Sequence, residues 1–142
     1  MRVALAVVLF AILLGLSLLH FQWARGSHWP AASEEALARA AVGDGRRRMP
    51  GQIACLAVSA LLLAIGLWPL VSLGYTGEAW AQRVSVVIAG AFAARGLGGF
   101  TPRWRQFFYD EPFTTFDRRY YSPFCIVLGL AFAALASGDF GK

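Results

Sequence analysis

Charged residues are scarce in this chain of 142 residues: Asp, Glu, Lys and Arg make up 15%, where soluble domains carry about 25%. Hydrophobic residues make up 58%, above the roughly 45–50% of soluble domains. These two departures exclude an ordinary soluble domain and indicate a membrane protein. The length allows one domain, and the absence of polar low-complexity tracts excludes a disordered chain.

Residues that hold metals or carry out hydrolytic chemistry are also few. The chain has two cysteines, Cys55 and Cys125, and two histidines, with no C-x-x-C pair and no zinc-type spacing. It contains no G-x-S-x-G motif and no glycine-rich phosphate loop. We therefore expect no bound metal and no cofactor, and we favour a non-enzymatic protein over an enzyme.

Lysine occurs once, at Lys142, against twelve arginines, and the net charge is +5. A basic balance can indicate nucleic-acid binding, but no nucleic-acid-binding motif is present. The arginines instead lie in segments between apolar runs, as membrane topology requires. We therefore predict that this charge meets membrane lipids and not nucleic acid.

Four apolar runs divide the chain, at 2–21, 52–73, 79–97 and 120–138. Three of them approach the roughly 20 residues that a helix needs to cross a bilayer. The third run is weaker, because only 11 uncharged residues separate Arg83 from Arg95, and a core helix or a re-entrant segment is its alternative. The first run is longer than the apolar core of a signal peptide, so we expect it to be retained.

Reading all four runs as transmembrane helices predicts an all-α polytopic membrane protein. It would be a compact four-helix bundle forming a single domain over residues 1–142. The loops at 22–51 and 96–119 are long and must share one face of the membrane, whereas the loop at 74–79 is a tight turn. The two long loops, with Arg95 at their edge, carry ten of the twelve arginines. The positive-inside rule then places this face in the cytoplasm and both termini outside.

The first long loop has structure of its own. Ser33 is a good N-cap residue for a helix over 34–42, whose first turn holds an acidic pair that suits the positive end of the helix dipole, with Gly43 as its stop. The basic run Arg46, Arg47 and Arg48 follows, either as lipid-headgroup contacts or as a solvated topology signal. After the second long loop, we expect Ser122 to cap the last helix with Pro123 in its first turn.

Side chains capable of chemistry gather at the long-loop face: His20, Trp23, Arg95, Asp117 and Tyr121. A charged group at the membrane boundary needs a partner, and Asp117 is the preferred partner of Arg95. The pair would be a structural ion pair, or part of a ligand-binding or catalytic site. His20 would be a general acid/base or, more simply, a histidine hydrogen-bonded to backbone. If the face binds a ligand, we expect a cavity lined by His20, Arg95 and Tyr121.

The alternative partners of Arg95 are Asp110 and Glu111, which lie in the same long loop. The cysteines leave two readings open as well. Cys55 and Cys125 each lie about four residues into parallel helices, so they would form a thiol pair if those helices touch. Otherwise they are small buried hydrophobic residues.

Two segments resemble a known signature: Arg-Gly-Leu-Gly-Gly-Phe at 95–100 and Phe-Asp-Arg-Arg-Tyr-Tyr-Ser-Pro-Phe-Cys at 116–125. They are similar to a family of small bacterial integral membrane proteins of unknown function, with about four helices and a tail that reads Asp, two or three residues, Tyr-Ser-Pro-Leu-Cys-Leu. The early His20-Phe-x-Trp23-Ala-x-Gly26 resembles the family's first loop. The resemblance implies a bacterial inner-membrane bundle and a meaningful group of Arg95, Asp117, Tyr121 and Cys125.

The chain departs from the family pattern at two positions. Phe124 stands where the family has Leu, and Gly99 stands where the pattern implies an acidic residue in a Gly-Asp-Phe triplet. If that acid pairs with the arginine in other members, Asp117 or Asp110 must do so here.

These observations lead to three hypotheses. The first is an uncharacterised membrane protein that binds a lipid, a small molecule or a partner protein at the polar long-loop face. The second is a small membrane-embedded enzyme or redox protein that acts on a lipid or quinone-like substrate. The third is an oligomeric transporter, which we rank last because the helices have little internal charge. A homo-oligomer or a complex with a membrane partner is compatible with each.

Overall fold

The structure, a computed structural model, describes residues 1–137, and within that range all regular secondary structure is helical, with no strand. Four long helices form its body: α1 (Arg2–Ala24), α3 (Gln52–Ser72), α4 (Ala79–Gly98) and α7 (Ser122–Ser137). Shorter elements connect them: α2 (Glu34–Ala41), a 3₁₀ turn (Leu73–Tyr75), α5 (Pro102–Phe107), α6 (Phe113–Phe116) and a π turn (Asp117–Tyr121). The all-α prediction is confirmed. Lys142 and the end of the last predicted span at Gly138 lie outside the described residues.

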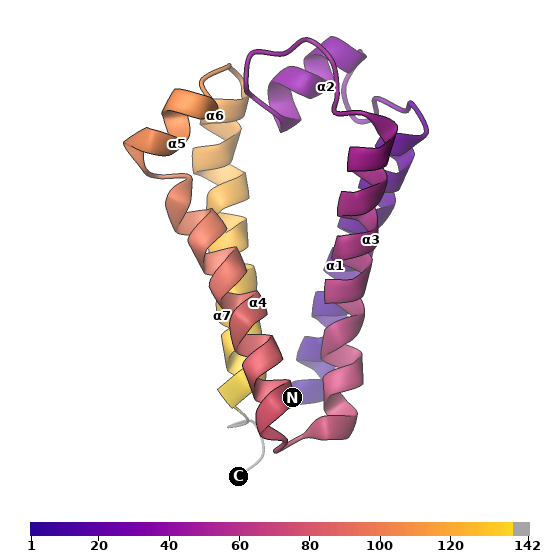
Figure 1. Cartoon of the computed structure of the whole chain (residues 1–142), viewed down its shortest axis with the longest axis vertical. Helices are drawn as coiled ribbons and strands as arrows, with labels where there is room; N and C mark the ends of the chain where they lie inside the picture. The colour runs from indigo at the N-terminus through magenta and orange to yellow at the C-terminus, as the bar shows by residue number, and fades with distance from the viewer. Residues whose placement is uncertain (138–142) are drawn as a thin grey trace.

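The four long helices pack as two pairs, α1 with α3 and α4 with α7 (Figure 1). The pairs meet at the end that carries the turn between α3 and α4, and they diverge toward the end covered by α2, α5 and α6 (Figure 1). We call these the turn end and the loop end. The molecule therefore resembles a V, with the N-terminus near the turn end.

The core joins the two pairs near the turn end. Phe132 of α7 is 0% exposed and stacks on Phe92 of α4, with ring centroids 5.9 Å apart. Leu9 and Leu13 of α1 are equally buried in the same cluster. Close approach of backbones holds the second pair together, because a Cβ on Gly129 would lie only 3.0 Å from a carbonyl oxygen of α4.

Polar groups inside the bundle are paired. Ser17 of α1 and Ser59 of α3 each donate a hydrogen bond to the carbonyl of the other, both at 2.8 Å. The indole of Trp68 donates to the hydroxyl of Ser85 at 2.9 Å, which links α3 to α4. Such interhelical hydrogen bonds are worth about 0.6 kcal/mol on average inside membranes.

Three helical stretches are long and apolar enough to cross a membrane: 2–24, 52–75 and 113–137. Helix α4 coincides with the run expected at 79–97, but it is not among the three, because Arg83 and Arg95 lower its apolar character. The helix itself is therefore confirmed, and its crossing of the membrane stays a prediction. The second long loop is shorter than expected, since helical structure resumes at Phe113.

The expected helix start near residue 120 is wrong. Ser122 is not an N-cap but a fully buried residue in the middle of a helix that runs from Phe113 to Ser137. A π turn makes this possible: the amide of Ser122 donates to the carbonyl of Asp117, five residues back. Pro123 has no amide hydrogen, and its ring would clash with a carbonyl four residues earlier in a regular helix. The wider turn just before it accommodates the ring.

The helix expected in the first long loop is confirmed. The side chain of Ser33 accepts a hydrogen bond from the amide of Ala36 at 3.1 Å, and the acidic first turn follows. The chain leaves α2 through Gly43, whose φ of +73° lies in the left-handed region. A side chain here would also overlap the ring of Phe113, so glycine is required on both counts.

Candidate functional site

A cavity of about 630 Å³ lies at the loop end, and both helix pairs contribute to its wall. Its lining is mostly apolar and comes from α1, the loop after it, α2, α4, α6 and the π turn: Leu16, Leu19, His20, Trp23, Pro30, Ala31, Leu37, Ala40, Ala41, Arg95, Phe113, Phe116 and Tyr121. Of the predicted polar group, His20, Trp23, Arg95 and Tyr121 share this wall. The expected cavity lined by His20, Arg95 and Tyr121 is therefore present.

Helix α2 closes the cavity toward the loop end and is fixed to the second helix pair. The hydroxyl of Tyr121 donates to the carbonyl of Ala40 at 3.0 Å. The amide of Asp110 donates to the carbonyl of Gly43 at 3.0 Å, and the carboxylate of Asp110 lies 3.5 Å from Arg39. These polar contacts hold α2, which we call the roof of the cavity, in place across the gap between the helix pairs.

The positive charge of Arg95 at the cavity wall is neutralised by a buried acidic residue, Asp117. The guanidinium of Arg95 donates to the carboxylate of Asp117 at 2.6 Å and to the hydroxyl of Ser122 at 3.4 Å. Asp117 is only 1% exposed, whereas the Arg95 side chain is 31% exposed, and the guanidinium also lies 4.3 Å from the ring centroid of Trp104. The preferred pairing of Arg95 with Asp117 is confirmed.

The alternative partners of Arg95 are wrong. Asp110 pairs with Arg39, and Glu111 accepts hydrogen bonds from the hydroxyl of Thr114 and the amide of Thr115. These bonds, that from Thr114 foremost, lower the pKa of Glu111.

The π turn and one glycine together make the ion pair possible. Asp117 and Ser122 are five residues apart, which in a regular helix puts side chains about 140° apart around the axis. The π turn widens the helix by one residue, so both side chains face Gly99 at the end of α4. A Cβ on Gly99 would overlap the Ser122 hydroxyl and lie 2.8 Å from the Asp117 carboxylate. The site has no room for an acidic residue at position 99, so that expectation does not suit this chain.

His20 has the simpler arrangement that the sequence allowed. Its Nδ1 lies 2.8 Å from the carbonyl of Leu16, one turn earlier, and its ring centroid is 4.7 Å from that of Trp23. A carbonyl only accepts, so Nδ1 is the donor in this contact, which leaves Nε2 as the second hydrogen-bonding position of the ring. The indole of Trp23 donates to the carbonyl of Trp29 at 2.8 Å, which orients this part of the wall.

The structure does not bring the cysteines together. Both are free thiols; Cys55 lies on α3 and Cys125 on α7, so they belong to different helix pairs. The thiol of Cys55 lies 3.5 Å from the carbonyl of Pro50, beside a pocket of about 270 Å³ that shares His20 with the main cavity. Among residues 1–137, no three His, Cys, Asp or Glu side chains form a metal-binding group.

Residues 13–132 match the family described as "Protein of unknown function (DUF3995)". The chain belongs to this family. The matched region contains the whole wall of the cavity and the Arg95–Asp117 ion pair. No curated protein and no solved structure matches the chain. The DUF3995 assignment confirms the resemblance to a family of unknown function and carries no activity with it.

The basic run of this DUF3995 protein is exposed, and part of its charge is already paired. Arg46 lies 2.6 Å from the carboxylate of Asp44, and Arg47 lies 3.0 Å from that of Glu35. Arg48 makes no ion pair with any residue of the described part of the chain. The lipid-headgroup role of these three residues stays a prediction.

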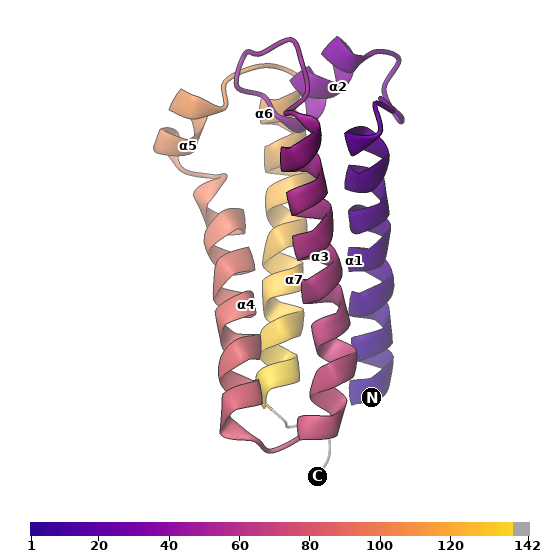
Figure 2. The same ribbon diagram turned by 45° about the vertical axis from the view of Figure 1, so that its right-hand side comes forward.

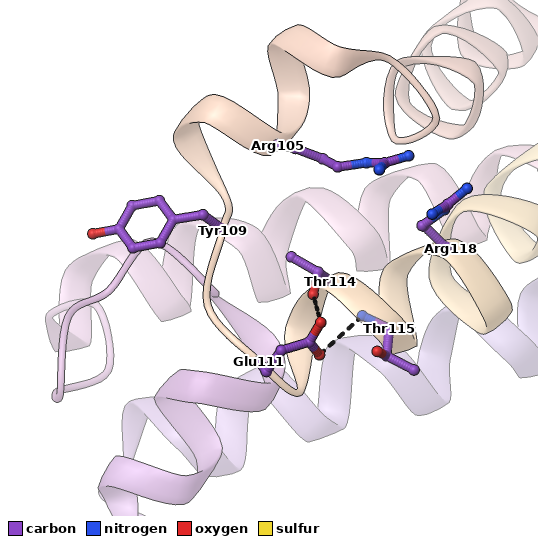
Figure 3. Close-up of a pocket in the computed structure, with 6 residues that line it drawn as sticks. All are labelled: Arg105, Tyr109, Glu111, Thr114, Thr115 and Arg118. Atoms are coloured by element: carbon purple, nitrogen blue, oxygen red, sulfur yellow. Dashed lines mark hydrogen bonds between the residues drawn. The ribbon is translucent and has the colours of Figure 1, made fainter.

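Sequence reasoning missed a second, smaller pocket on the loop end of this DUF3995 chain. It has a volume of about 320 Å³ and lies on the outer side of α6 (Figure 3). Six side chains line it: Arg105, Tyr109, Glu111, Thr114, Thr115 and Arg118. No spacing in the sequence indicates it, because α5 must first fold back toward the π turn before the two arginines share one pocket.

Proposed function

We propose that this DUF3995 protein spans the inner membrane four times and binds a neutral, largely apolar molecule, a lipid or a lipid-like small molecule, in the cavity at its loop end. The cavity itself carries the proposal. Its volume of about 630 Å³ falls within the roughly 300–1,000 Å³ of small-molecule sites. Its wall combines an apolar lining with a few fixed polar groups, which is the usual composition of such sites.

The connectivity supports a fourth span. Helices α3 and α7 both run from the loop end to the turn end, and α4 leaves the turn after α3 and returns to the loop end (Figure 2). If α3 and α7 cross the membrane, the segment that joins them must cross it too. Twenty residues of helix extend about 30 Å, which matches the bilayer core. Arg83 and Arg95 lie near its two ends, and the charge of Arg95 is neutralised there by Asp117.

The polar groups of the wall favour an uncharged ligand. Arg95 is neutralised by Asp117, so the cavity offers no net charge to an anion. What remains are single hydrogen-bonding positions, such as Nε2 of His20. We therefore propose a ligand with an apolar body and one polar, uncharged end, a description that fits a diacylglycerol or a quinone-like molecule.

Mass spectrometry of the purified protein tests this proposal. The wild-type protein, extracted in mild detergent, should carry a bound apolar molecule that native mass spectrometry detects. Ala40 lines the cavity, so Ala40→Trp should fill it and abolish the bound species. Ala64→Trp is the matched control, because Ala64 is exposed on α3, and it should keep the species. A wild type without a bound molecule, or an Ala40→Trp variant that retains it, would contradict the proposal.

Cysteine labelling tests the topology. In a variant without Cys55 and Cys125, a single cysteine at Arg47 reports on the loop end and one at Thr76 on the turn end. The ten arginines at and near the loop end support a cytoplasmic location for it. An impermeant maleimide should therefore label Thr76→Cys in intact cells and Arg47→Cys only after permeabilisation. The opposite result would reverse the orientation, and labelling of both in intact cells would exclude an odd number of crossings between them.

A further inference from the structure

The small pocket on the outer side of α6 brings two arginines together from separate elements. Arg105 extends from α5 and Arg118 from the π turn, and their guanidinium groups point toward one another (Figure 3). The neighbouring Phe113 and Phe116 line the main cavity and not this pocket, so the two sites lie on different faces of one helix. A ligand in this pocket would therefore bind independently of the cavity ligand.

Neither arginine is neutralised by the protein. Among residues 1–137, every ion pair involves other arginines, and neither guanidinium donates a side-chain hydrogen bond. Glu111 lines the same pocket, but its carboxylate accepts from the hydroxyl of Thr114 and the amide of Thr115 (Figure 3). These bonds hold it on the threonine side. The pocket thus has a net positive charge, with two like charges facing the space between them.

We propose that this pocket binds a phosphate group between Arg105 and Arg118. The planar guanidinium offers a fork of donors that matches phosphate oxygens in pairs, and two forks on one anion relieve their mutual repulsion. The hydroxyl of Thr115 adds a neutral donor, since that of Thr114 already donates to Glu111. An isolated carboxylate would fill only one of the two forks, so phosphate fits better.

The surroundings suit a phosphate held at the membrane boundary. The pocket lies where the apolar stretch 113–137 begins, which on the proposed membrane topology is the boundary between headgroups and hydrocarbon. Phe107 is 68% exposed and Tyr109 is 63% exposed beside it, as is usual for aromatic residues in the headgroup layer. The same chemistry would also hold a free phosphate or a soluble phosphate ester.

Thermal unfolding of the purified protein in uncharged detergent tests the site. The probes are phosphatidic acid, a diacylglycerol with the same acyl chains, and inorganic phosphate against chloride at equal ionic strength. A ligand that binds the folded state raises the melting temperature in a concentration-dependent way. Phosphatidic acid should raise the melting temperature. Diacylglycerol should not reproduce the part of this rise that depends on Arg105 and Arg118. Arg105→Gln and Arg118→Gln should each weaken the apparent affinity at least tenfold.

The controls separate this site from general charge effects and from the cavity. Arg103→Gln removes one positive charge from the same short helix without touching the pocket and should keep the full shift. Arg118→Lys keeps the charge but loses the fork, so it should bind more weakly than wild type. Ala40→Trp fills the main cavity and should leave the phosphatidic acid shift unchanged.

The outcomes identify the source of the phosphate. If inorganic phosphate gives the same arginine-dependent shift, the ligand is a soluble phosphate; if only phosphatidic acid does, it is a lipid headgroup. An equal shift in the Arg105, Arg118 and Arg103 variants would overturn the proposal. If neither inorganic phosphate nor phosphatidic acid shifts the melting temperature of the wild type, the proposal is overturned as well.

Discussion

The two ends of the bundle use the same helices in different ways. Near the turn end, the space between the helix pairs is filled by Phe132, Leu9 and Leu13, which are at most 2% exposed. At the loop end, the same space is a cavity of about 630 Å³ with apolar walls. Its roof and wall are joined by polar contacts instead: Tyr121 with Ala40, and Asp110 with Gly43.

Because of this difference, the turn end provides stability by close packing, and the loop end provides the space in which a ligand can bind. Close packing leaves the turn end no room for a ligand, whereas the loop end keeps its shape with few buried side chains between the helix pairs. A cavity of this kind survives only if directional contacts hold its walls apart, because apolar walls otherwise gain dispersion contacts by closing. The variants below test whether packing and polar contacts are divided in this way.

The largest effect should come from two matched phenylalanine substitutions, one at each end. Phe132→Ala removes a fully buried ring and should lower the free energy of unfolding by about 3 kcal/mol. Phe116→Ala only enlarges a cavity that already exists, so it should cost about 1 kcal/mol or less. Unfolding in mixed micelles with increasing sodium dodecyl sulfate measures both. Equal losses would show that the loop end is as tightly packed as the turn end.

Removing the buried carboxylate should have the next largest effect. Asp117→Asn leaves the guanidinium of Arg95 without its counter-charge and should cost about 2–3 kcal/mol, since Arg95 is partly exposed. The double variant Asp117→Asn with Arg95→Gln removes the stranded charge and should recover part of the loss. A single variant as stable as wild type would mean that the pair does not hold the loop end together.

A smaller effect should follow from loosening the roof. Tyr121→Phe removes the hydroxyl that donates to Ala40 and should cost about 1 kcal/mol. Hydrogen exchange should increase in α2 and leave α1 and α3 at the turn end unchanged. Ser17→Ala is the comparison, because it removes a hydrogen bond within the first helix pair and should leave α2 protected. If hydrogen exchange in the Tyr121→Phe variant increased throughout the bundle and not in α2 alone, α2 would not be held separately from the rest.

The exposed ion pair should contribute least. Glu35→Gln breaks the contact with Arg47, but both side chains are 59% exposed, so the change should be below about 0.5 kcal/mol. Raising the salt concentration should reduce even this difference. A loss of stability as large as that of Asp117→Asn would mean that solvent exposure does not explain the difference between the two ion pairs.

Much of the helical framework could be predicted because apolar runs and capping residues are local signals. The run at 79–97 corresponds to α4, and Ser33 caps α2 as its sequence indicates. The start of the last helix was missed, because the charged and aromatic residues before Pro123 are typical of a loop. A π turn has no residue pattern of its own, so the sequence could not show that the helix continues through them.

The candidate site was predictable only in part, for a similar reason. Opposite charges at one end of a bundle predict the pairing of Arg95 with Asp117, and the structure has it. The cavity depends on how far the helix pairs diverge, and the Arg105–Arg118 pocket depends on how α5 folds back. Both are consequences of the packing of whole elements, which no single residue encodes.

The π turn sets a strict rule for the length of this segment. It offsets the two parts of one continuous helix, so that Asp117 reaches Arg95 while Tyr121 and the aromatic residues before it face the cavity. Deleting one residue between Asp117 and Tyr121 would restore a regular helix, in which Asp117 and Ser122, then four residues apart, would still lie only about 40° apart around the axis. The ion pair would then keep its place, but the ring of Pro123 would clash with a carbonyl four residues earlier. Substitutions within 118–120 should therefore be tolerated far better than any change in their number.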